Sequence, residues 1–163
     1  MPKKGQGASE YLVLLAIVLI VAIVAIVLVG GFAGLGGGAR ETESKQYWSG
    51  ATRPFTIPEY SQQGNTIYLT LKNMEPYKLV ITNITITSPY GTIVDSYDNQ
   101  TISFKGGAKK TITDFGIVNT SYACNTTSYD YYEYGVVITY RTENGIVKSQ
   151  YGEKPLVGDC IVT

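Results

Sequence analysis

An uninterrupted apolar run near the N-terminus constrains this chain more than any other feature. From Tyr11 to Val29 the sequence holds no charged residue, no proline and no glycine. A helix of this length is about 28 Å long, close to the hydrocarbon thickness of a bilayer. The run therefore predicts a long apolar helix, and its length and hydropathy are those of a membrane span.

The residues before this run predict how the chain is processed. Lys3 and Lys4 are basic, and a Gly5-Gln6 junction follows them. An ordinary secretory signal is cut after its apolar core, which discards the core. Cleavage between Gly5 and Gln6 removes only MPKKG and leaves the helix on the mature chain. A cut near Ala33, after the helix, is the alternative.

Residues Lys3 to Leu12 resemble the class III signal peptide of archaeal type IV pilins. The resemblance implies that a prepilin peptidase cleaves after Gly5, so that the mature chain begins at Gln6. The fifth mature residue in that family is a glutamate, and here it is Glu10. The resemblance assigns Glu10 to filament assembly. On charge and hydropathy alone, a signal anchor with Glu10 at the membrane interface fits as well.

Composition divides the chain into three predicted parts. Residues 1–5 are the leader, and residues 6–38 are the apolar helix followed by a glycine-rich neck. Six of the nine residues from Gly30 to Gly38 are glycine. Each glycine costs about 1 kcal/mol in a helix interior, so the neck is expected to end or soften the helix. Residues 39–163 form the third part, an extracellular domain.

The third part has the pattern of an all-β fold. Alternation of apolar and polar residues, or short β-rich runs, predict strands over 66–73, 79–87, 92–95, 101–104, 109–118, 134–142 and 146–151. Asn144-Gly145 between two such runs predicts a hairpin. Several short strands separated by turns indicate a sandwich. The predicted fold class is α+β, a long N-terminal hydrophobic helix followed by an all-β sandwich. The pilin resemblance implies that the sandwich is immunoglobulin-like.

The two cysteines favour a disulfide over a metal site. Cys124 and Cys160 have no metal-binding or redox spacing, and the chain has no histidine. In an oxidising compartment the two are expected to pair, and closing a loop of this size is worth about 3–4 kcal/mol. Two buried free thiols are the alternative. No metal and no cofactor are predicted.

The sequence also carries acceptor motifs for N-glycosylation. An N-x-[ST] motif is short and weak alone, but several on an exported chain predict glycosylation. The alternative is ordinary polar residues of loops and strand faces. The candidate asparagines are Asn83, Asn99, Asn119 and Asn125.

Tyrosine is abundant, with 14 in the chain, and four crowd around Asp130 and Glu133. They are Tyr129, Tyr131, Tyr132 and Tyr134. A rigid apolar ring with a polar tip suits an interface. A sugar- or surface-binding patch and packing against neighbouring subunits or glycans are both compatible with this cluster.

Charge and motifs exclude two other function classes. The 13 basic and 13 acidic residues cancel, and no basic patch appears, so no nucleic acid partner is predicted. With no histidine as a general base, no nucleophile elbow and no phosphate-binding glycine loop, no enzyme activity is predicted.

These observations predict a structural subunit of an extracellular archaeal type IV-like pilus. The subunit would polymerise through its apolar helix into a homo-oligomeric filament that serves surface adhesion, after residence in the cell membrane. The resemblance implies a prepilin peptidase, an assembly platform and an assembly ATPase as partners. The alternatives are a membrane-anchored extracytoplasmic binding module and a minor pilin that tips or primes a filament without forming its bulk.

Overall fold

The computed structural model describes residues 6–28, 32–97, 101–116, 120–124 and 131–161. Contacts between Cα atoms divide the chain into two compact units, Met1–Ala39 and Arg40–Thr163. The first unit holds the apolar helix, and the second, called the β unit below, holds all of the described strands.

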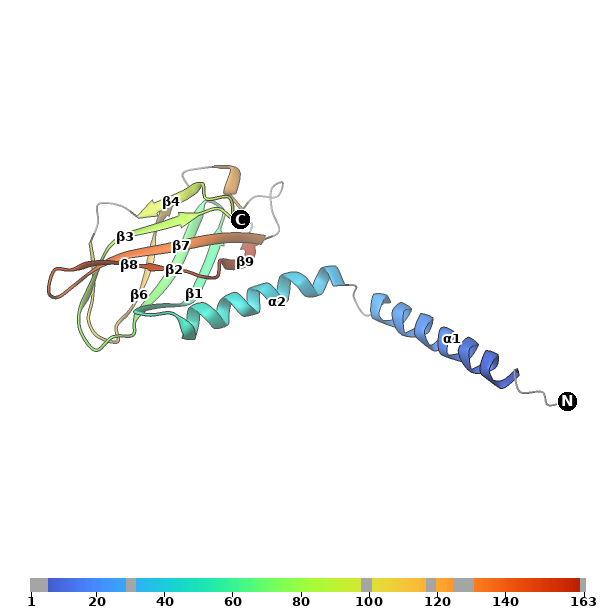
Figure 1. The fold of residues 1–163 in the computed structure, drawn as a ribbon. Helices are drawn as coiled ribbons and strands as arrows, with labels where there is room; N and C mark the ends of the chain where they lie inside the picture. The colour runs from blue at the N-terminus through green and yellow to red at the C-terminus, as the bar shows by residue number, and fades with distance from the viewer. Residues whose placement is uncertain (1–5, 29–31, 98–100, 117–119, 125–130, 162–163) are drawn as a thin grey trace. The chain divides into compact units, whose positions relative to one another are not determined.

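The apolar run is helical, as predicted. Helix α1 spans Gln6–Leu28 (Figure 1). From Glu10 to Leu28 it contains neither proline nor glycine, the two strongest helix breakers. Over the part of the chain that the structure describes, no helix is both long and apolar enough to be identified as a membrane span, so the prediction of a span from Tyr11 to Val29 is not confirmed there.

The glycine-rich segment, which was expected to end or soften the helix, is helical in its described part. Helix α2 spans Phe32–Gln46, so the described glycines from Gly34 to Gly38 lie within a helix. Gly30 and Gly31 lie outside the described residues. Intrinsic propensity is a weak local preference that tertiary contacts override. Here the second half of α2 is held by hydrogen bonds to the β unit, and the helix crosses the domain boundary predicted at residue 39.

A single π-helical turn at Tyr47–Ala51 follows α2 and leads into the strands. The strands are β1 (Phe55–Gln63), β2 (Thr66–Asn73), β3 (Leu79–Thr87), β4 (Ile93–Tyr97), β5 (Ile102–Phe104), β6 (Lys109–Gly116), β7 (Tyr131–Thr142), β8 (Val147–Tyr151) and β9 (Leu156–Ile161). A short 3-10 turn at Thr120–Tyr122 lies between β6 and β7.

The strands form one continuous sheet that curls on itself. Its order is β4-β3-β7-β9-β1-β2-β6, with β5 paired to β3 and β8 paired to β7. β4 and β6, the two ends of this order, contact each other. In Figure 1, β3, β7 and β8 run across β1, β2 and β6, so two layers enclose a core.

Strands β7 and β9 join the two layers. The first residues of β7 pair antiparallel with β9, from Tyr131 opposite Asp159 to Tyr134 opposite Leu156. The end of β9 then pairs in parallel with the end of β1. This arrangement is mostly β-sheet and compatible with an all-β sandwich. An immunoglobulin-like topology is not confirmed.

One hydrophobic core lies between the layers. Along β7 the side chains of Tyr132, Tyr134, Val136, Ile138 and Tyr140 are buried and alternate with less buried neighbours. This period of two is expected for a strand with one face on a core. The same cluster contains the fully buried residues Trp48, Phe55, Ile57, Leu69, Leu71, Ile81, Ile84, Ile86, Val94 and Phe104.

Most predicted strands are confirmed, and two were missed. β2 and β3 have the predicted bounds, and β4, β5, β7 and β8 differ by a few residues at their ends. The end predicted for β6 at residues 117–118 lies outside the described residues. The hairpin is confirmed: Thr142 and Ile146 are hydrogen-bonded across the turn, and Gly145 has a φ of 80°. Strands β1 and β9 were not predicted.

Candidate functional site

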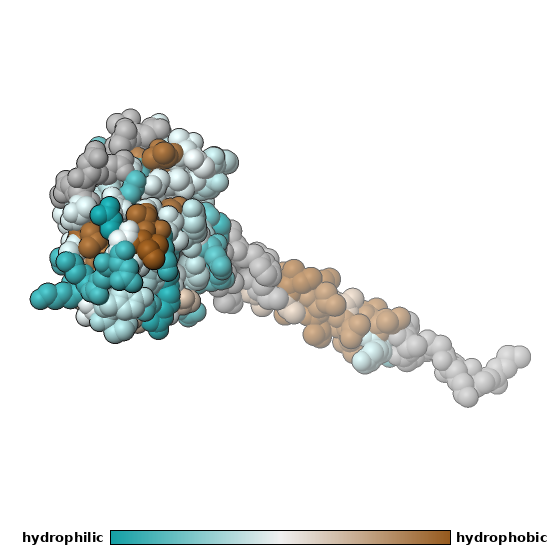
Figure 2. All heavy atoms as spheres, turned by 60° about the vertical axis from the view of Figure 1, so that its left-hand side comes forward, coloured by the Kyte–Doolittle hydropathy of each residue, from teal (hydrophilic) through white to brown (hydrophobic). Residues whose placement is uncertain are grey.

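Helix α1 presents apolar side chains around its whole circumference. Its large apolar residues from Tyr11 to Val24 are exposed by between 49% and 67%, with Val24 lowest and Val18 highest. Figure 2 shows this stretch as a continuous hydrophobic surface. A helix that is apolar on every face must bury all of its faces against other apolar groups. This surface is the first candidate site.

Glu10 lies at the start of this apolar surface and is exposed. It is four residues after Gln6, the first residue of α1, so the two positions share one face of the helix. The structure thus places the predicted assembly residue one turn from the predicted mature N-terminus. Gly5 lies outside the described residues.

Within the β unit, Ser44 anchors the second half of α2 to β9. Its side chain is buried, and Oγ donates to the carbonyl oxygen of Pro155 at 2.8 Å and accepts from the amide of Val157 at 3.0 Å. The hydroxyl of Tyr60 on β1 lies 2.8 Å from the same oxygen and 3.0 Å from the Val157 carbonyl oxygen. The Ser44 hydroxyl, near the C-terminal end of α2, therefore takes the place of a neighbouring strand as hydrogen-bond partner of the Val157 amide.

Two ion pairs flank this anchor. Arg40 Nη2 lies 2.9 Å from Glu133 Oε1 on β7, and Lys154 pairs with Glu43. The hydrogen bond and the charge of Lys154 lower the pKa of the Glu43 carboxyl below its ordinary value. Arg40, Lys154 and Glu43 are well exposed and Glu133 is 20% exposed, so each pair contributes little to stability.

Trp48 continues the anchor into the core. The indole is fully buried, and its Nε1 donates to the carbonyl oxygen of Lys154 at 3.0 Å. The ring packs against the backbone of Gly152, where a Cβ atom would lie 2.3 Å from a ring carbon. Gly152 is therefore required for this close approach.

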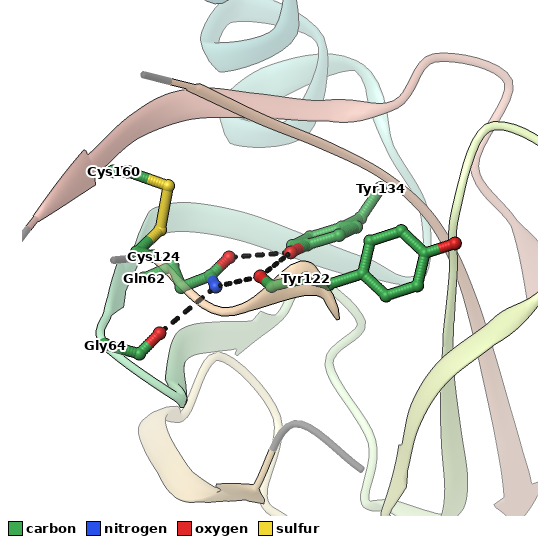
Figure 3. The surroundings of a disulfide bond; sticks show 6 residues. All are labelled: Gln62, Gly64, Tyr122, Cys124, Tyr134 and Cys160. Atoms are coloured by element: carbon green, nitrogen blue, oxygen red, sulfur yellow. Dashed lines mark hydrogen bonds between the residues drawn. A yellow bond between two sulfur atoms is a disulfide. The ribbon is translucent and has the colours of Figure 1, made fainter. Parts of the chain in front are cut away.

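The predicted disulfide is present and joins the segment after the 3-10 turn to β9. Cys124 and Cys160 are bonded, with their Cα atoms 5.2 Å apart. The buried side chain of Gln62 lies beside them (Figure 3). Its Nε2 donates to the carbonyl oxygen of Tyr122 at 2.8 Å, and its Oε1 accepts from the hydroxyl of Tyr134 at 2.8 Å. The bridge and this network fix the end of β1, the end of β9 and the start of β7 together.

The sequon asparagines are only partly described. Asn83 lies on β3, is half-buried, and its Oδ1 accepts from the hydroxyl of Thr85 at 3.3 Å. That threonine belongs to the same sequon. Asn99, Asn119 and Asn125 lie outside the described residues, so glycosylation at the four positions stays a prediction.

Sequence reasoning missed the residues that hold α2. Ser44 lies in a polar helical stretch and Gln62 in an unpredicted strand, and neither belongs to a motif. Trp48 carried a usable signal, because it is the single tryptophan of the chain and a large apolar residue directly after a polar segment. Such a residue is usually buried.

Comparison with known protein families identifies the N-terminal segment. Residues 3–29 match the class III signal peptide family. The match confirms the signal peptide predicted from Lys3 to Leu12 and supports a type IV pilin-family protein. It covers the leader and the apolar run but none of the β unit. No curated protein matches the chain.

Two solved structures are similar to the chain. The C-terminal domain of wzt shares 13% identity, with 68% of this chain and 74% of that chain covered and a TM-score of 0.37. A calcium-binding mutant of Bacteroides uniformis beta-glucuronidase 2 shares 18% identity over 61% of this chain, with a TM-score of 0.30. The matched region spans 13% of that enzyme's length. Both TM-scores are too low to support an argument.

Proposed function

We propose that this chain is the structural subunit of an extracellular type IV-like pilus of the archaeal kind, which polymerises through α1 and serves adhesion to surfaces. The class III signal peptide over residues 3–29 is the observation that carries the proposal. The exposed apolar surface of α1 supports it, because this surface needs an apolar environment that the chain does not itself supply.

Assembly would be driven by water exclusion. Burying a large apolar side chain contributes about 1.5–3 kcal/mol, so packing α1 against copies of itself would yield tens of kcal/mol gross. Before assembly we propose that lipid covers the same surface. Because lipid is as apolar as another helix, filament formation from lipid then depends on close packing and on polar pairing.

Glu10 is the residue that we propose for this polar pairing. Cleavage between Gly5 and Gln6 would create a positive α-amino group one helical turn from its carboxylate. An unpaired charge in an apolar core is costly, whereas a charged pair in a low dielectric attracts strongly. A carboxylate of one subunit facing the amine of the next would select the axial register of the filament.

The β unit would form the outer part of each subunit. The contacts of Ser44 and Trp48 hold the end of α2 on the segment that leads into β9, so these residues of the helix belong to the β unit. A prepilin peptidase, an assembly platform and an assembly ATPase are the partners proposed with this function. The proposal assigns no catalytic activity and no cofactor to the chain.

The first test is the mature N-terminus of material sheared from cells. Mass spectrometry is expected to find Gln6 as the first residue, and Gly5→Leu is expected to block cleavage. A mature terminus downstream of Ala33 would overturn the proposal, because α1 would then have been discarded.

The second test separates processing from assembly. Glu10→Ala is expected to leave cleavage at Gly5 intact and to reduce filament yield sharply. Glu153→Ala, which removes an exposed carboxylate from the β unit, is the charge-matched control and is expected to keep the yield. Glu10→Gln distinguishes an ion pair from a hydrogen bond, since retained assembly would favour the latter. Normal yield from Glu10→Ala would refute the assembly role.

A further inference from the structure

A pocket in the β unit is lined largely by tyrosine, and neither the fold nor the proposed polymerisation explains it. Its volume is about 260 Å³. The residues that define this tyrosine pocket are Tyr90, Tyr122, Tyr131, Tyr132, Glu133 and Tyr134. Small-molecule pockets typically measure about 300–1,000 Å³, so this pocket suits a ligand near the small end of that range, such as one sugar ring.

Two of these tyrosines offer exposed rings and two are fixed in the wall. Tyr90 is 92% exposed and Tyr131 is 54% exposed, whereas Tyr132 and Tyr134 are buried. The buried pair is stacked, with ring centroids 5.4 Å apart. The exposed rings are apolar faces with polar tips, and a ligand with both C–H and hydroxyl groups would complement them.

The wall of the pocket is preformed. Cys160 borders the pocket, and its bond to Cys124 holds the Tyr122 segment against β9. The carbonyl oxygen of Tyr122 accepts from Gln62, and the hydroxyl of Tyr134 donates to the same glutamine (Figure 3). A wall fixed in this way reduces the entropy lost when a ligand binds.

The charge of the pocket favours a neutral ligand. Among the residues that define the pocket, Glu133 is the one acidic residue. Nη2 of Arg40 lies 2.9 Å from Oε1 of this carboxylate. A carboxylate balanced by a guanidinium can still accept hydrogen bonds from hydroxyl groups, but it does not require a cationic ligand. The nearby Arg40 also disfavours an organic cation, which an unbalanced carboxylate among aromatic rings would attract.

We propose that the tyrosine pocket binds a neutral pyranose unit of a glycan. One face of the ring would pack on Tyr90 and Tyr131, and its hydroxyl groups would donate to Glu133 and contact the tyrosine tips. The inference names a ligand class for surface adhesion, and it holds or fails independently of filament formation. The sugar would come from a foreign surface or from an N-linked glycan of a neighbouring subunit.

The test uses the full-length chain made without glycosylation and kept in a polyoxyethylene detergent, which has no sugar headgroup. Saturation-transfer NMR would measure binding of the methyl glycosides of glucose, galactose, mannose and N-acetylglucosamine. Binding of at least one is expected. Tyr90→Ala and Tyr131→Ala are each expected to weaken it roughly 3- to 10-fold, the value of one aromatic contact.

Tyr151→Ala is the matched control, because Tyr151 is 70% exposed on β8 and does not line the pocket. It is expected to bind as the wild type does. No binding of any glycoside, equal binding by the Tyr90 and Tyr131 variants, equal loss in the Tyr151 variant, or binding of tetramethylammonium in place of sugars would each overturn the proposal.

A second arm identifies the source of the sugar. Sheared native filaments would be compared before and after enzymatic removal of N-linked glycans. If the pocket takes a glycan from a neighbouring subunit, the free glycoside is expected to bind only after removal. If it takes a foreign glycan, binding is expected in both preparations. Binding in neither preparation contradicts the proposal.

Discussion

The side-chain amide of Gln150 pairs with both backbone polar groups of Phe55. Gln150 Oε1 accepts from the Phe55 amide at 3.0 Å, and Nε2 donates to the Phe55 carbonyl oxygen at 2.8 Å. Both residues are buried. Gln150 lies on β8 in one layer and Phe55 begins β1 in the other. One glutamine therefore supplies the strand pairing that the backbone cannot make at this junction.

Replacing Gln150 is expected to destabilise the β unit strongly. Gln150→Leu removes the two hydrogen bonds and leaves the buried amide of Phe55 unpaired, at about 1–3 kcal/mol, whereas the Phe55 carbonyl oxygen keeps the hydroxyl of Thr52 at 2.8 Å. Urea unfolding would measure the free energy of unfolding. Ser149→Ala, on the neighbouring exposed position of β8, is the control and is expected to change it by less than about 0.5 kcal/mol. A neutral Gln150→Leu would contradict this pairing.

Gly152→Ala is expected to disturb the anchor of the helix. A Cβ atom there would lie 2.3 Å from the Trp48 ring, and forced overpacking typically costs about 1–3 kcal/mol. Tryptophan fluorescence would report the displaced indole, and urea unfolding would report the loss of stability. Gly50→Ala is the control, because a Cβ atom at Gly50 meets nothing within 4 Å. Equal stability of the two variants would show that Trp48 moves aside without cost.

Loss of the disulfide is expected to destabilise the β unit and to leave its strands in place. Replacing Cys124 and Cys160 by alanine frees a loop with a sequence separation of 36, worth about 3–4 kcal/mol. Reductant is expected to lower the unfolding midpoint of the wild type and to leave the double variant unchanged. Quantitative alkylation of both thiols in the absence of reductant would show that the bond does not form in the protein.

Stability is expected to fall in alkaline solution. Burial raises the pKa of Tyr132 above its ordinary value of 10.0. Below pH 10 the phenol keeps its proton in both the folded and the unfolded chain, so the free energy of unfolding does not depend on this group there. Above pH 10 the unfolded chain releases the proton first, and stability falls by about 1.4 kcal/mol per pH unit.

Tyr132→Phe is expected to reduce this alkaline slope, because phenylalanine has no proton to release. Tyr90→Phe is the control, since that side chain is 92% exposed, and it is expected to keep the slope. Tyr60 and Tyr140 have pKa values raised by burial as well, so a residual slope is expected in Tyr132→Phe. An unchanged slope in Tyr132→Phe would assign the alkaline loss to other residues.

Local patterns were sufficient for several elements of this protein. The apolar run predicts α1, alternation predicts β2 and β3 with their bounds, and Asn144-Gly145 predicts the β7–β8 hairpin. Each of these depends on residues close together in the sequence. The class III signal peptide belongs to the same group, because it is a short linear segment.

Other features depend on contacts between distant residues. β1 contains Pro58 and several polar residues, so its sequence pattern does not predict a strand. It is a strand in the structure because it pairs with β2 and β9, and because Gln150 hydrogen-bonds to its first residue. The end of α2 is anchored by Ser44, and the following turn by Trp48, through hydrogen bonds to Pro155 and Lys154, which lie more than 100 residues away in the sequence. The tyrosine pocket forms only when Tyr90 and Tyr122 meet β7. By itself the sequence determined the class III signal peptide, the apolar helix and most strands, because these depend on residues close together in the chain. Tertiary packing decided the closure of the sheet, the anchor of the helix and the pocket, because these bring together residues far apart in the chain.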